Sequence, residues 1–225
     1  MSYKAIIFDM DGTIIDTNNI WKKATCELIE ARGITLDAEL QEELLHRTQG
    51  LALIESCKIV KDMAGLDDSV EHLIKEKARR ACNLYAQDIK FIIGFEEFHQ
   101  NVMLHQLKNG IATNADDETL LISKQKLNLE KFFGKHIYNI THVNNLYKPH
   151  PALYLHAAEQ LEVDPKNCIA IEDSAHGVQA AKSAGMVCIG INSTSSLKQL
   201  HKADMIVNHY DEIDLAQLLG INKPT

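Results

Sequence analysis

The stretch Ala5-Ile6-Ile7-Phe8-Asp9-Met10-Asp11-Gly12-Thr13 decides the fold class of this 225-residue chain. Its first four residues form an unbroken apolar run, which is typical of a strand buried on both faces of a parallel sheet. Two carboxylates and a glycine follow at once. Because ligands bind beyond the carboxyl ends of the strands in an open parallel sheet, this order predicts a buried first strand that ends in a reactive site.

The chain beyond this strand shows two different patterns of apolar residues. Residues 21–88 carry apolar positions at helical spacing and almost no strand signal, which predicts about four helices in succession. Strands and helices then alternate, and this predicts a parallel, doubly wound α/β sheet. The expected strands after the first are 111–113, 136–140, 168–171, 187–191 and 205–207, and the expected helices are 95–108 (ending at Asn109-Gly110), 118–127, 151–161, 178–184 and 215–219.

The interruption of this alternation predicts two domains. We expect an α/β, Rossmann-like core formed by residues 1–17 and 90–225, with an α-helical cap inserted at 18–89. The two chain crossings, at 16–19 and 88–94, would form the hinge between them.

The composition narrows the classes of partner. The hydrophobic fraction of 45% with 24% charged residues is typical of a globular protein. The net charge of -8, with Lys and Arg scattered, argues against nucleic acid, which requires a basic stripe. No apolar run is long enough to span a bilayer, and the five cysteines are far apart with no secretory leader before them. We therefore expect a cytoplasmic protein with reduced thiols, no membrane association and no obligatory protein partner.

Polar side chains follow four of the expected strands. Because these ends meet at one edge of a parallel sheet, we expect the side chains to share one crevice. They are Asp9, Asp11, Gly12 and Thr13 after the first strand, Thr113 and Asn114 after the second, Lys148 after the third, and Glu172 with Asp173 after the fourth.

The carboxylates among these residues predict a metal site. Asp9 and Asp11 are two residues apart, so in extended backbone they point to the same side and repel each other. Asp173 adds a further hard oxygen ligand of the kind that Mg²⁺ prefers. A carboxylate that attacks a phosphate also needs a cation, since two unit charges 4 Å apart repel by ~4 kcal/mol at an effective dielectric constant near 20.

The remaining polar groups suit phosphoryl transfer. Lys148 would neutralise one phosphate oxygen, and the Thr113 hydroxyl would donate a hydrogen bond to another. Asp11 is well placed to protonate a leaving alcohol and later to accept a proton from water. Gly12 allows a sharp turn whose amides face the phosphate.

These residues resemble the four signatures of the haloacid dehalogenase-like superfamily, in the expected order along nearly the whole chain. Asp9-Met10-Asp11-Gly12-Thr13 matches the first, Thr113 the second, Lys148-Pro149 the third, and Glu172-Asp173-Ser174 with Gly177 the fourth. The resemblance implies an aspartyl-phosphate on Asp9, an acid/base role for Asp11, and a helical cap. It also implies Mg²⁺ bound by Asp9, the Asp11 carbonyl, Asp173 directly and Glu172 through water.

Within this superfamily the chain is similar to the β-phosphoglucomutase-like branch, which includes sugar-phosphate phosphatases and a mutase. The mutase has a cap arginine three residues after a glycine, where this chain has Leu53 after Gly50, and a histidine where this chain has Trp21. Trp21 resembles hexitol- and deoxysugar-phosphate phosphatases instead. We therefore expect a phosphatase for a small phosphorylated metabolite, with Trp21 and Gln49 as substrate contacts in the cap.

Other interpretations stay open at this point. A phosphosugar mutase and a non-catalytic binding module are both compatible with the fold, whereas dehalogenation is disfavoured because dehalogenases of this superfamily lack the second aspartate. An EF-hand loop would need glycine and an acid where the chain has Ile14 and Ile20. The histidines show no pair at zinc-ligand spacing. Taken singly, Lys148 could be a solvated lysine and Trp21 a core residue of the cap.

Overall fold

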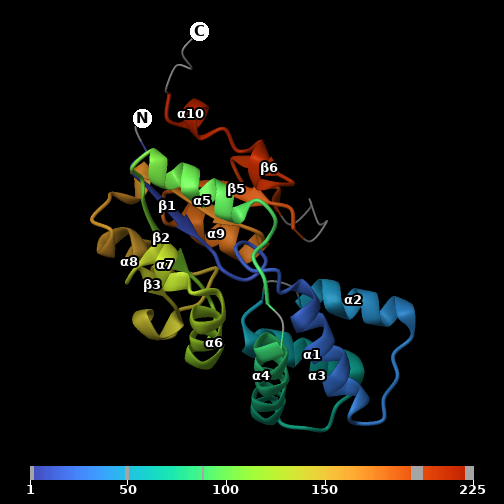
Figure 1. Ribbon diagram of the computed structural model, residues 1–225. Coiled ribbons are helices and arrows are strands. Elements are labelled where there is room, and N and C mark those ends of the chain that lie inside the picture. The colour runs from blue at the N-terminus through green and yellow to red at the C-terminus, as the bar shows by residue number, and fades with distance from the viewer. Residues whose placement is uncertain (1–2, 49–50, 88, 194–199, 221–225) are drawn as a thin grey trace.

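The protein is built around one parallel sheet, which is seen in the computed structural model in Figure 1. The structure describes residues 3–48, 51–87, 89–193 and 200–220. The sheet has six strands in the order β3-β2-β1-β4-β5-β6, and every neighbouring pair is parallel. The strands are β1 (Ala5–Phe8), β2 (Lys108–Ala112), β3 (Ile137–Tyr138), β4 (Cys168–Glu172), β5 (Val187–Ile191) and β6 (Met205–Val207). The expected α/β fold with a parallel sheet is confirmed.

The helices fall into two groups. The first group, between β1 and β2, is α1 (Asn18–Glu30), α2 (Ala38–Thr48), α3 (Leu53–Ala64) and α4 (Val70–Gln87), followed by α5 (Phe95–Leu104). The second group is α6 (Asp117–Leu127), α7 (Leu129–Phe133), α8 (Ala152–Gln160), α9 (Ala175–Ser183) and α10 (Leu215–Leu218).

The apolar run of β1 is buried because helices cover both faces of the sheet. Ile6 and Phe8 belong to one hydrophobic cluster, which includes apolar side chains of α5 and α7. Ala5 and Ile7 point the other way, into a cluster with side chains of α8 and α9. This alternation is the period of two that a strand imposes on its side chains. The core is therefore a three-layer sandwich with β1 at its centre.

The expected boundary between α5 and β2 is wrong, and smaller differences occur at β3 (Ile137–Tyr138, expected 136–140) and α9 (Ala175–Ser183, expected 178–184). Asn109-Gly110 was expected to end a helix, but α5 ends at Leu104 and both residues lie inside β2. The chain reverses at Gln106, whose φ of 56° lies in the left-handed region. Gly110 is needed within the sheet, since a Cβ there would lie 2.9 Å from the His136 carbonyl oxygen. The glycine at position 110 is explained by the close approach of the backbone at His136, not by helix termination.

Helices α1 to α4 lie together beside the sheet (Figure 1), and their buried side chains form a separate hydrophobic cluster. Leu28 and Ile29 of α1, Leu44 of α2, Val60 of α3 and Leu73 of α4 are buried together. This is the helical insertion that the apolar spacing predicted. The division into a core and a cap at 18–89 stays a prediction.

The two chain crossings between these parts lie side by side. The Asp16 amide donates to the Lys90 carbonyl at 3.0 Å, and the Ile92 amide donates to the Ile14 carbonyl at 2.8 Å. Ile15 and Phe91 form an antiparallel bridge between them. The crossings are therefore joined by backbone hydrogen bonds.

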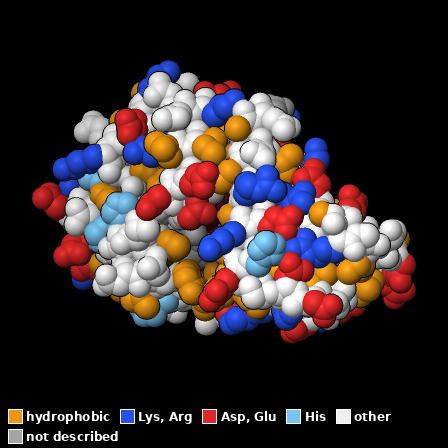
Figure 2. Space-filling view, turned by 90° about the horizontal axis from the view of Figure 1, so that it is seen from below, with side chains coloured by type: hydrophobic (Ala, Val, Ile, Leu, Met, Phe, Trp, Pro, Cys, Tyr) orange, Lys and Arg blue, Asp and Glu red, His pale blue; other side chains and the backbone are white. Residues whose placement is uncertain are grey.

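The surface carries charges of both signs. On the face shown in Figure 2, Lys and Arg side chains are interspersed with Asp and Glu side chains, as the scattered charges of the sequence predicted. Among the described residues, every helix is too short or too polar to cross a membrane.

Candidate active site

The carboxylates of the candidate site meet where β1 and β4 end. These two strands are neighbours, and the strand order reverses direction between them, which is where open α/β sheets bind ligands. Phe8 pairs with Ile171, so Asp9 follows β1 at the level where Glu172 closes β4. Carboxylate oxygens of Asp9, Glu172 and Asp173 lie within 4.8 Å of one another. The structure thus brings together residues that are far apart in the sequence.

Lys148 lies between two of these carboxylates. Its Nζ is 2.5 Å from Asp9 Oδ1 and 2.6 Å from Glu172 Oε1, and its side chain is 3% exposed. Burial opposes the charge on the amine, but the carboxylates of Asp9 and Glu172 outweigh it and raise the pKa of Lys148. The lysine is therefore a fixed positive charge beside the predicted nucleophile, while its predicted contact with a phosphate oxygen stays a prediction.

Glu172 is fully buried and its carboxylate is held by the protein. Oε1 accepts from Lys148 and from the Tyr154 hydroxyl at 2.8 Å, and Oε2 accepts from the amide and hydroxyl of Ser174. A Cβ on Gly177 would lie 1.8 Å from this carboxylate, so only glycine leaves room for it. These contacts favour a role in positioning Lys148, while the predicted water-mediated metal contact stays a prediction.

Asp9 and Asp173 are buried at a cost that a cation would offset. Burial raises the pKa of Asp9 to about 7, although Lys148 acts in the opposite direction. Burial, followed by the charge of Asp9, raises the pKa of Asp173 well above its usual range. Since one lysine faces three carboxylates here, the donor set fits a hard divalent cation such as Mg²⁺.

Asp11 is held by both parts of the protein. Its carboxylate accepts hydrogen bonds from the Tyr85 hydroxyl of α4 and from Thr17, which precedes α1. Burial raises the pKa of Asp11, whereas these two hydrogen bonds lower it. A raised pKa favours the protonated form that a general acid requires.

The turn after β1 contains backbone amides that could donate hydrogen bonds to a ligand. Gly12 has a φ of 81°, and a Cβ there would lie 2.1 Å from Asp173 Oδ2. Its own amide donates to the Ile15 carbonyl, so Gly12 provides space and a turn and is not itself a free donor. Among the residues that the structure describes, the Met10 and Asp11 amides have no acceptor. They are the amides of this turn that remain for the predicted phosphate.

Thr113 and Asn114 lie at the end of β2 as expected. Thr113 Oγ1 accepts from the Ala115 amide at 3.1 Å, which leaves its hydroxyl hydrogen to be donated. Asn114 Oδ1 accepts from the Lys148 amide at 3.0 Å, so its NH₂ group remains as a donor. Both residues line the same cavity as Asp9, Asp11, Lys148 and Asp173.

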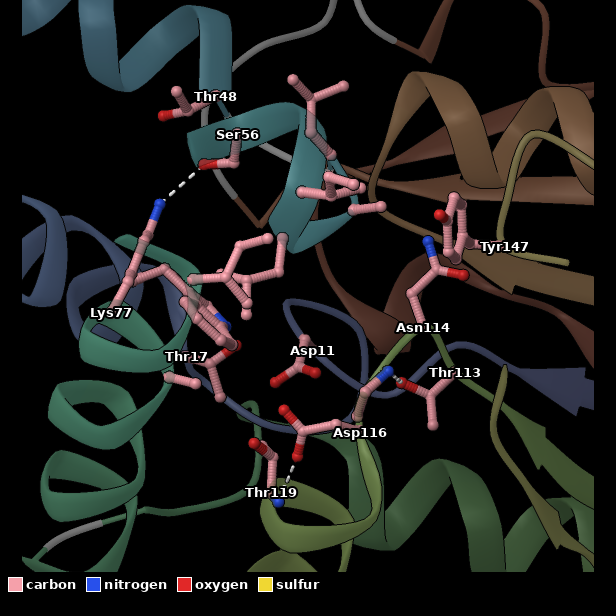
Figure 3. Close-up of a pocket in the computed structure, with 18 of the residues that line it drawn as sticks. Asp11, Thr17, Thr48, Ser56, Lys77, Thr113, Asn114, Asp116, Thr119 and Tyr147 are labelled. Carbon is pink, nitrogen blue, oxygen red and sulfur yellow. Dashed lines mark hydrogen bonds between the residues drawn. The ribbon is translucent and has the colours of Figure 1, made fainter. Parts of the chain in front are cut away.

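This cavity has a volume of about 610 Å³ and is walled on its other side by the inserted helices. Trp21 lines it and packs edge-to-face on Tyr85, with ring centroids 6.2 Å apart. Figure 3 shows Asp11 in the middle, with Thr113, Asn114 and Asp116 on the sheet side and Lys77 with Ser56 on the helical side. Gln49 lies outside the described residues.

Sequence reasoning missed Tyr85, Lys77 and Ser56. A signal for the first two was present, since Leu73, Lys77, Ala81 and Tyr85 recur every four residues and are all buried on one face of α4. A lysine and a tyrosine in such a stripe indicate polar groups that face another part of the protein. Ser56 carries no comparable signal in the sequence.

Comparison with known proteins identifies the family. A family model described as haloacid dehalogenase-like hydrolase matches residues 6–191, and the chain belongs to this family. It is 31% identical over 183 residues to a "Phosphorylated carbohydrates phosphatase" of Thermotoga maritima, covering 81% of this chain and 82% of that protein. It is 29% identical over 186 residues to a "6-phosphogluconate phosphatase" of Escherichia coli, covering 81% and 80%. The crystal structure of a "putative beta-phosphoglucomutase" from Thermotoga maritima is similar, with a TM-score of 0.70, 27% identity, and coverage of 97% and 100%.

Proposed function

We propose that this hydrolase is a Mg²⁺-dependent phosphatase, which hydrolyses a small phosphomonoester, a sugar or polyol phosphate, through a phospho-aspartate on Asp9. The observation that carries the proposal is the convergence of Asp9, Lys148 and Asp173 at one cavity, with Asp11 beside them. Phosphatases among the similar proteins support the same reaction class. We also infer a cytoplasmic location.

In the first step, a carboxylate oxygen of Asp9 attacks phosphorus and the ester oxygen leaves. Asp11 gives its proton to that oxygen, so the product leaves as a neutral alcohol. In the second step, Asp11 takes a proton from water, and the water oxygen attacks phosphorus. The bond to Asp9 then breaks, inorganic phosphate is released and Asp11 is protonated again.

The other residues stabilise charge on the transferring group. Lys148 and the hydroxyl of Thr113 face the phosphate, and Asn114 with the turn at Gly12 completes the donor set. Asp9, the Asp11 carbonyl and Asp173 would hold Mg²⁺. When bound, this ion would reduce the repulsion between the Asp9 carboxylate and the substrate phosphate. Glu172 holds Lys148 in place and could reach the ion through water.

The helical insertion at residues 18–89 would act as a cap that closes over this site. Trp21 faces the cavity and is proposed as a substrate contact, together with Gln49. A cavity of about 610 Å³ is within the range of roughly 300–1,000 Å³ typical of small-ligand sites. It is large enough for a phosphorylated metabolite and much larger than phosphate itself.

The test is hydrolysis of p-nitrophenyl phosphate with and without Mg²⁺. Asp9→Asn removes the nucleophile while keeping the shape of the side chain, and we expect kcat to fall about 10³-fold or more. Asp211→Asn, at an exposed position away from the cavity, is the matched control and should retain full activity. Substantial turnover by Asp9→Asn, or activity without metal, contradicts the mechanism.

A phosphosugar mutase is the second candidate, because a solved structure named as a putative β-phosphoglucomutase is similar over almost the whole chain. The two activities differ in product. Phosphorus NMR of a reaction with a hexose phosphate separates them, since a phosphatase releases inorganic phosphate and a mutase yields an isomeric ester.

A further inference from the structure

Lys77 is a buried lysine that the proposed reaction does not use. It lies on α4 and lines the cavity on the side opposite the carboxylates, yet only 3% of the residue is exposed. Within the described part of the chain, no carboxylate forms an ion pair with its amine, whose one hydrogen bond goes to Ser56 Oγ at 2.6 Å (Figure 3). Buried charges are usually paired, so an unpaired one beside a cavity calls for a ligand.

Lys77 and Ser56 have hydrogen-bond donors left over from their contact with each other. An ammonium group has three donors and no acceptor, and Lys77 uses one of them on Ser56. A lone pair of Ser56 Oγ is thereby occupied, and its hydroxyl hydrogen has no acceptor among the described residues. The group that completes this pair must accept hydrogen bonds from both.

Other hydroxyls on the cap side of the cavity are already engaged. Thr25 donates to the Trp21 carbonyl at 2.8 Å, and Thr48 donates to the Leu44 carbonyl at 2.9 Å. Much of the remaining wall is apolar, with Leu45, Leu53 and Ile74 among its residues. Among the described residues, Lys77 and Ser56 are therefore the buried polar groups on this side whose donors remain for a ligand.

The charges of the cavity wall are divided between its two sides. The helical side carries Lys77, with Lys22, Lys75 and Arg79 at exposed positions, and its described lining residues include no acid. The sheet side carries the acids Asp9, Asp11, Asp116, Glu118 and Asp173 with one cation, Lys148. A ligand that spans the cavity meets a metal site at one end and a cationic site at the other.

We propose that the substrate carries a carboxylate at the end remote from its phosphate, and that Lys77 and Ser56 bind this carboxylate. The substrate class is thus a phosphorylated sugar acid or a similar phosphorylated carboxylic acid. This inference rests on the proposed phosphatase function and narrows its substrate.

A carboxylate fits the pair better than a second phosphate. Lys77 supplies one buried positive charge, which matches the single charge of a carboxylate, and two adjacent donors match its two oxygens. A phosphate dianion at the same place would keep an uncompensated negative charge, because the other cations of this side are exposed to solvent.

The experiment compares 6-phosphogluconate with glucitol 6-phosphate, which have the same six-carbon chain and differ in having a carboxylate or a hydroxymethyl group at carbon 1. We expect wild-type kcat/KM to be about 10-fold or more higher for the acid, since a charge-assisted hydrogen bond is worth about that factor. Glucose 1,6-bisphosphate provides the arm with a second phosphate.

Two variants test the residues. Lys77→Met keeps the length of the side chain and removes the charge, and it should lower kcat/KM for the acid about 10- to 100-fold, mainly through KM, with a smaller loss for the polyol ester. Ser56→Ala should lower the preference for the acid to a lesser degree and remains informative if Lys77→Met does not fold. Lys23→Met, on an exposed position of α1 outside the cavity, removes the same charge and should keep the wild-type ratio.

Each other outcome overturns the inference. Equal kcat/KM for acid and polyol ester, or an unchanged ratio in both Lys77→Met and Ser56→Ala, would show that the pair does not bind a carboxylate, while hydrolysis itself would leave the proposed phosphatase intact. A preference for the bisphosphate over the acid would replace the carboxylate by a second phosphate. No hydrolysis of either ester or of p-nitrophenyl phosphate would remove both proposals together.

Discussion

Two buried lysines of this protein show how the surroundings decide what one residue type does. Lys148 and Lys77 are 4% and 3% exposed, so burial acts against the charge of both amines. Lys148 contacts Asp9 and Glu172, and its pKa is raised. Within the described part of the chain, Lys77 hydrogen-bonds to Ser56 and pairs with no carboxylate, and burial lowers its pKa to about 8. The first charge is compensated within the protein, and the second is not.

A stability measurement can detect this uncompensated charge. Below pH 8, folded and unfolded chains both carry the Lys77 proton, and the burial cost is fully present. As the pH rises from about 8 towards the ordinary value of 10.5, the folded chain releases the proton first, so wild-type stability increases relative to a variant without the amine. We therefore expect Lys77→Met to be more stable than wild type by about 2 kcal/mol at pH 7, allowing for its lost hydrogen bond.

Urea unfolding at pH 7 and pH 9.5 checks this expectation, with Lys23→Met as the control for loss of an exposed lysine. The gap between wild type and Lys77→Met should narrow at the higher pH. A gap that is independent of pH, or a variant less stable than wild type at both values, would mean that Lys77 is not an uncompensated charge.

The predictability of individual residues followed their position in the chain. Asp9, Thr113 and Asp173 were predictable because each comes directly after an apolar strand, and such ends meet at one edge. Lys148 lies further on, in the loop between β3 and α8, and its sequence position alone is a weaker indication. Tyr85 lies in the last turn of α4 and Ser56 in the first turn of α3, and the spacing of apolar residues along a helix does not say which part of the protein its buried face contacts. Their contacts with Asp11 and Lys77 depend on how the helices pack.

At the scale of the element, the turn from β4 to α9 determines where Lys148 sits. Glu172 ends β4, and Ser174 caps α9 by accepting from the Gly177 amide at 3.1 Å. The same Ser174 donates to Glu172, whose carboxylate packs on Gly177 and holds Lys148. The end of β4, the N-cap residue Ser174 and the first turn of α9 thus form one unit around the Glu172 carboxylate.

Gly177→Ala should disrupt this unit. The new Cβ would overlap the Glu172 carboxylate, so α9 or Glu172 must move, and we expect a loss of about 2 kcal/mol in unfolding free energy. Activity should fall as well, because Lys148 moves with Glu172. Denaturant unfolding and kcat on p-nitrophenyl phosphate measure the two effects.

Gly33→Ala is the control for this substitution. Its Cβ would meet nothing within 4 Å, and its φ of 71° makes the cost about 1 kcal/mol of backbone strain without any effect on the site. Equal losses of stability and activity in both variants would contradict the role of Gly177 in holding Glu172.

The elements themselves were predicted unevenly, for a physical reason. The strands Ala5–Phe8, Val187–Ile191 and Met205–Val207 were predicted with their observed ends, since each is a short, mostly apolar run that is followed directly by a polar residue. The start of β2 was missed because Lys108-Asn109-Gly110 has no apolar side chain, and its burial comes from the neighbouring strands. The short helix α7 was not predicted either.

At the scale of the whole molecule, the order of strands creates the site. β1 and β4 are adjacent in the sheet although most of the chain separates them, so Asp9 and Asp173 meet only in the folded protein. Burial raises the pKa of both groups, and neighbouring carboxylates raise it further, Glu172 at Asp9 and Asp9 with Glu172 at Asp173. A divalent ion bound between them should therefore stabilise the fold and not only the reaction.

Thermal unfolding with EDTA and with excess Mg²⁺ tests this coupling without any turnover. Ligand at 100 times its dissociation constant stabilises by about 2.7 kcal/mol, which corresponds to a rise in Tm of about 5 °C or more for a chain of this size. Asp173→Asn should lose most of this rise, whereas Asp211→Asn should retain it. The same rise in Asp173→Asn as in wild type would place the ion elsewhere.

The overall architecture was the most predictable level, since the alternation of strands and helices and the uninterrupted helical stretch both follow from the period of apolar residues. The strand order could not be read from that period. It depends on which strands pack side by side, and this is a property of the whole chain.

The paired crossings between sheet and insertion have a mechanical consequence. Because Asp16 is bonded to Lys90 and Ile92 to Ile14, neither segment can slide past the other without breaking backbone hydrogen bonds. The four helices are thus connected to the sheet through two segments that are hydrogen-bonded to each other, and this pairing opposes sliding of one segment along the other. A ligand that is bound at one end by the sheet side of the cavity and at the other by α4 would link the helices to the sheet and restrict their movement relative to it.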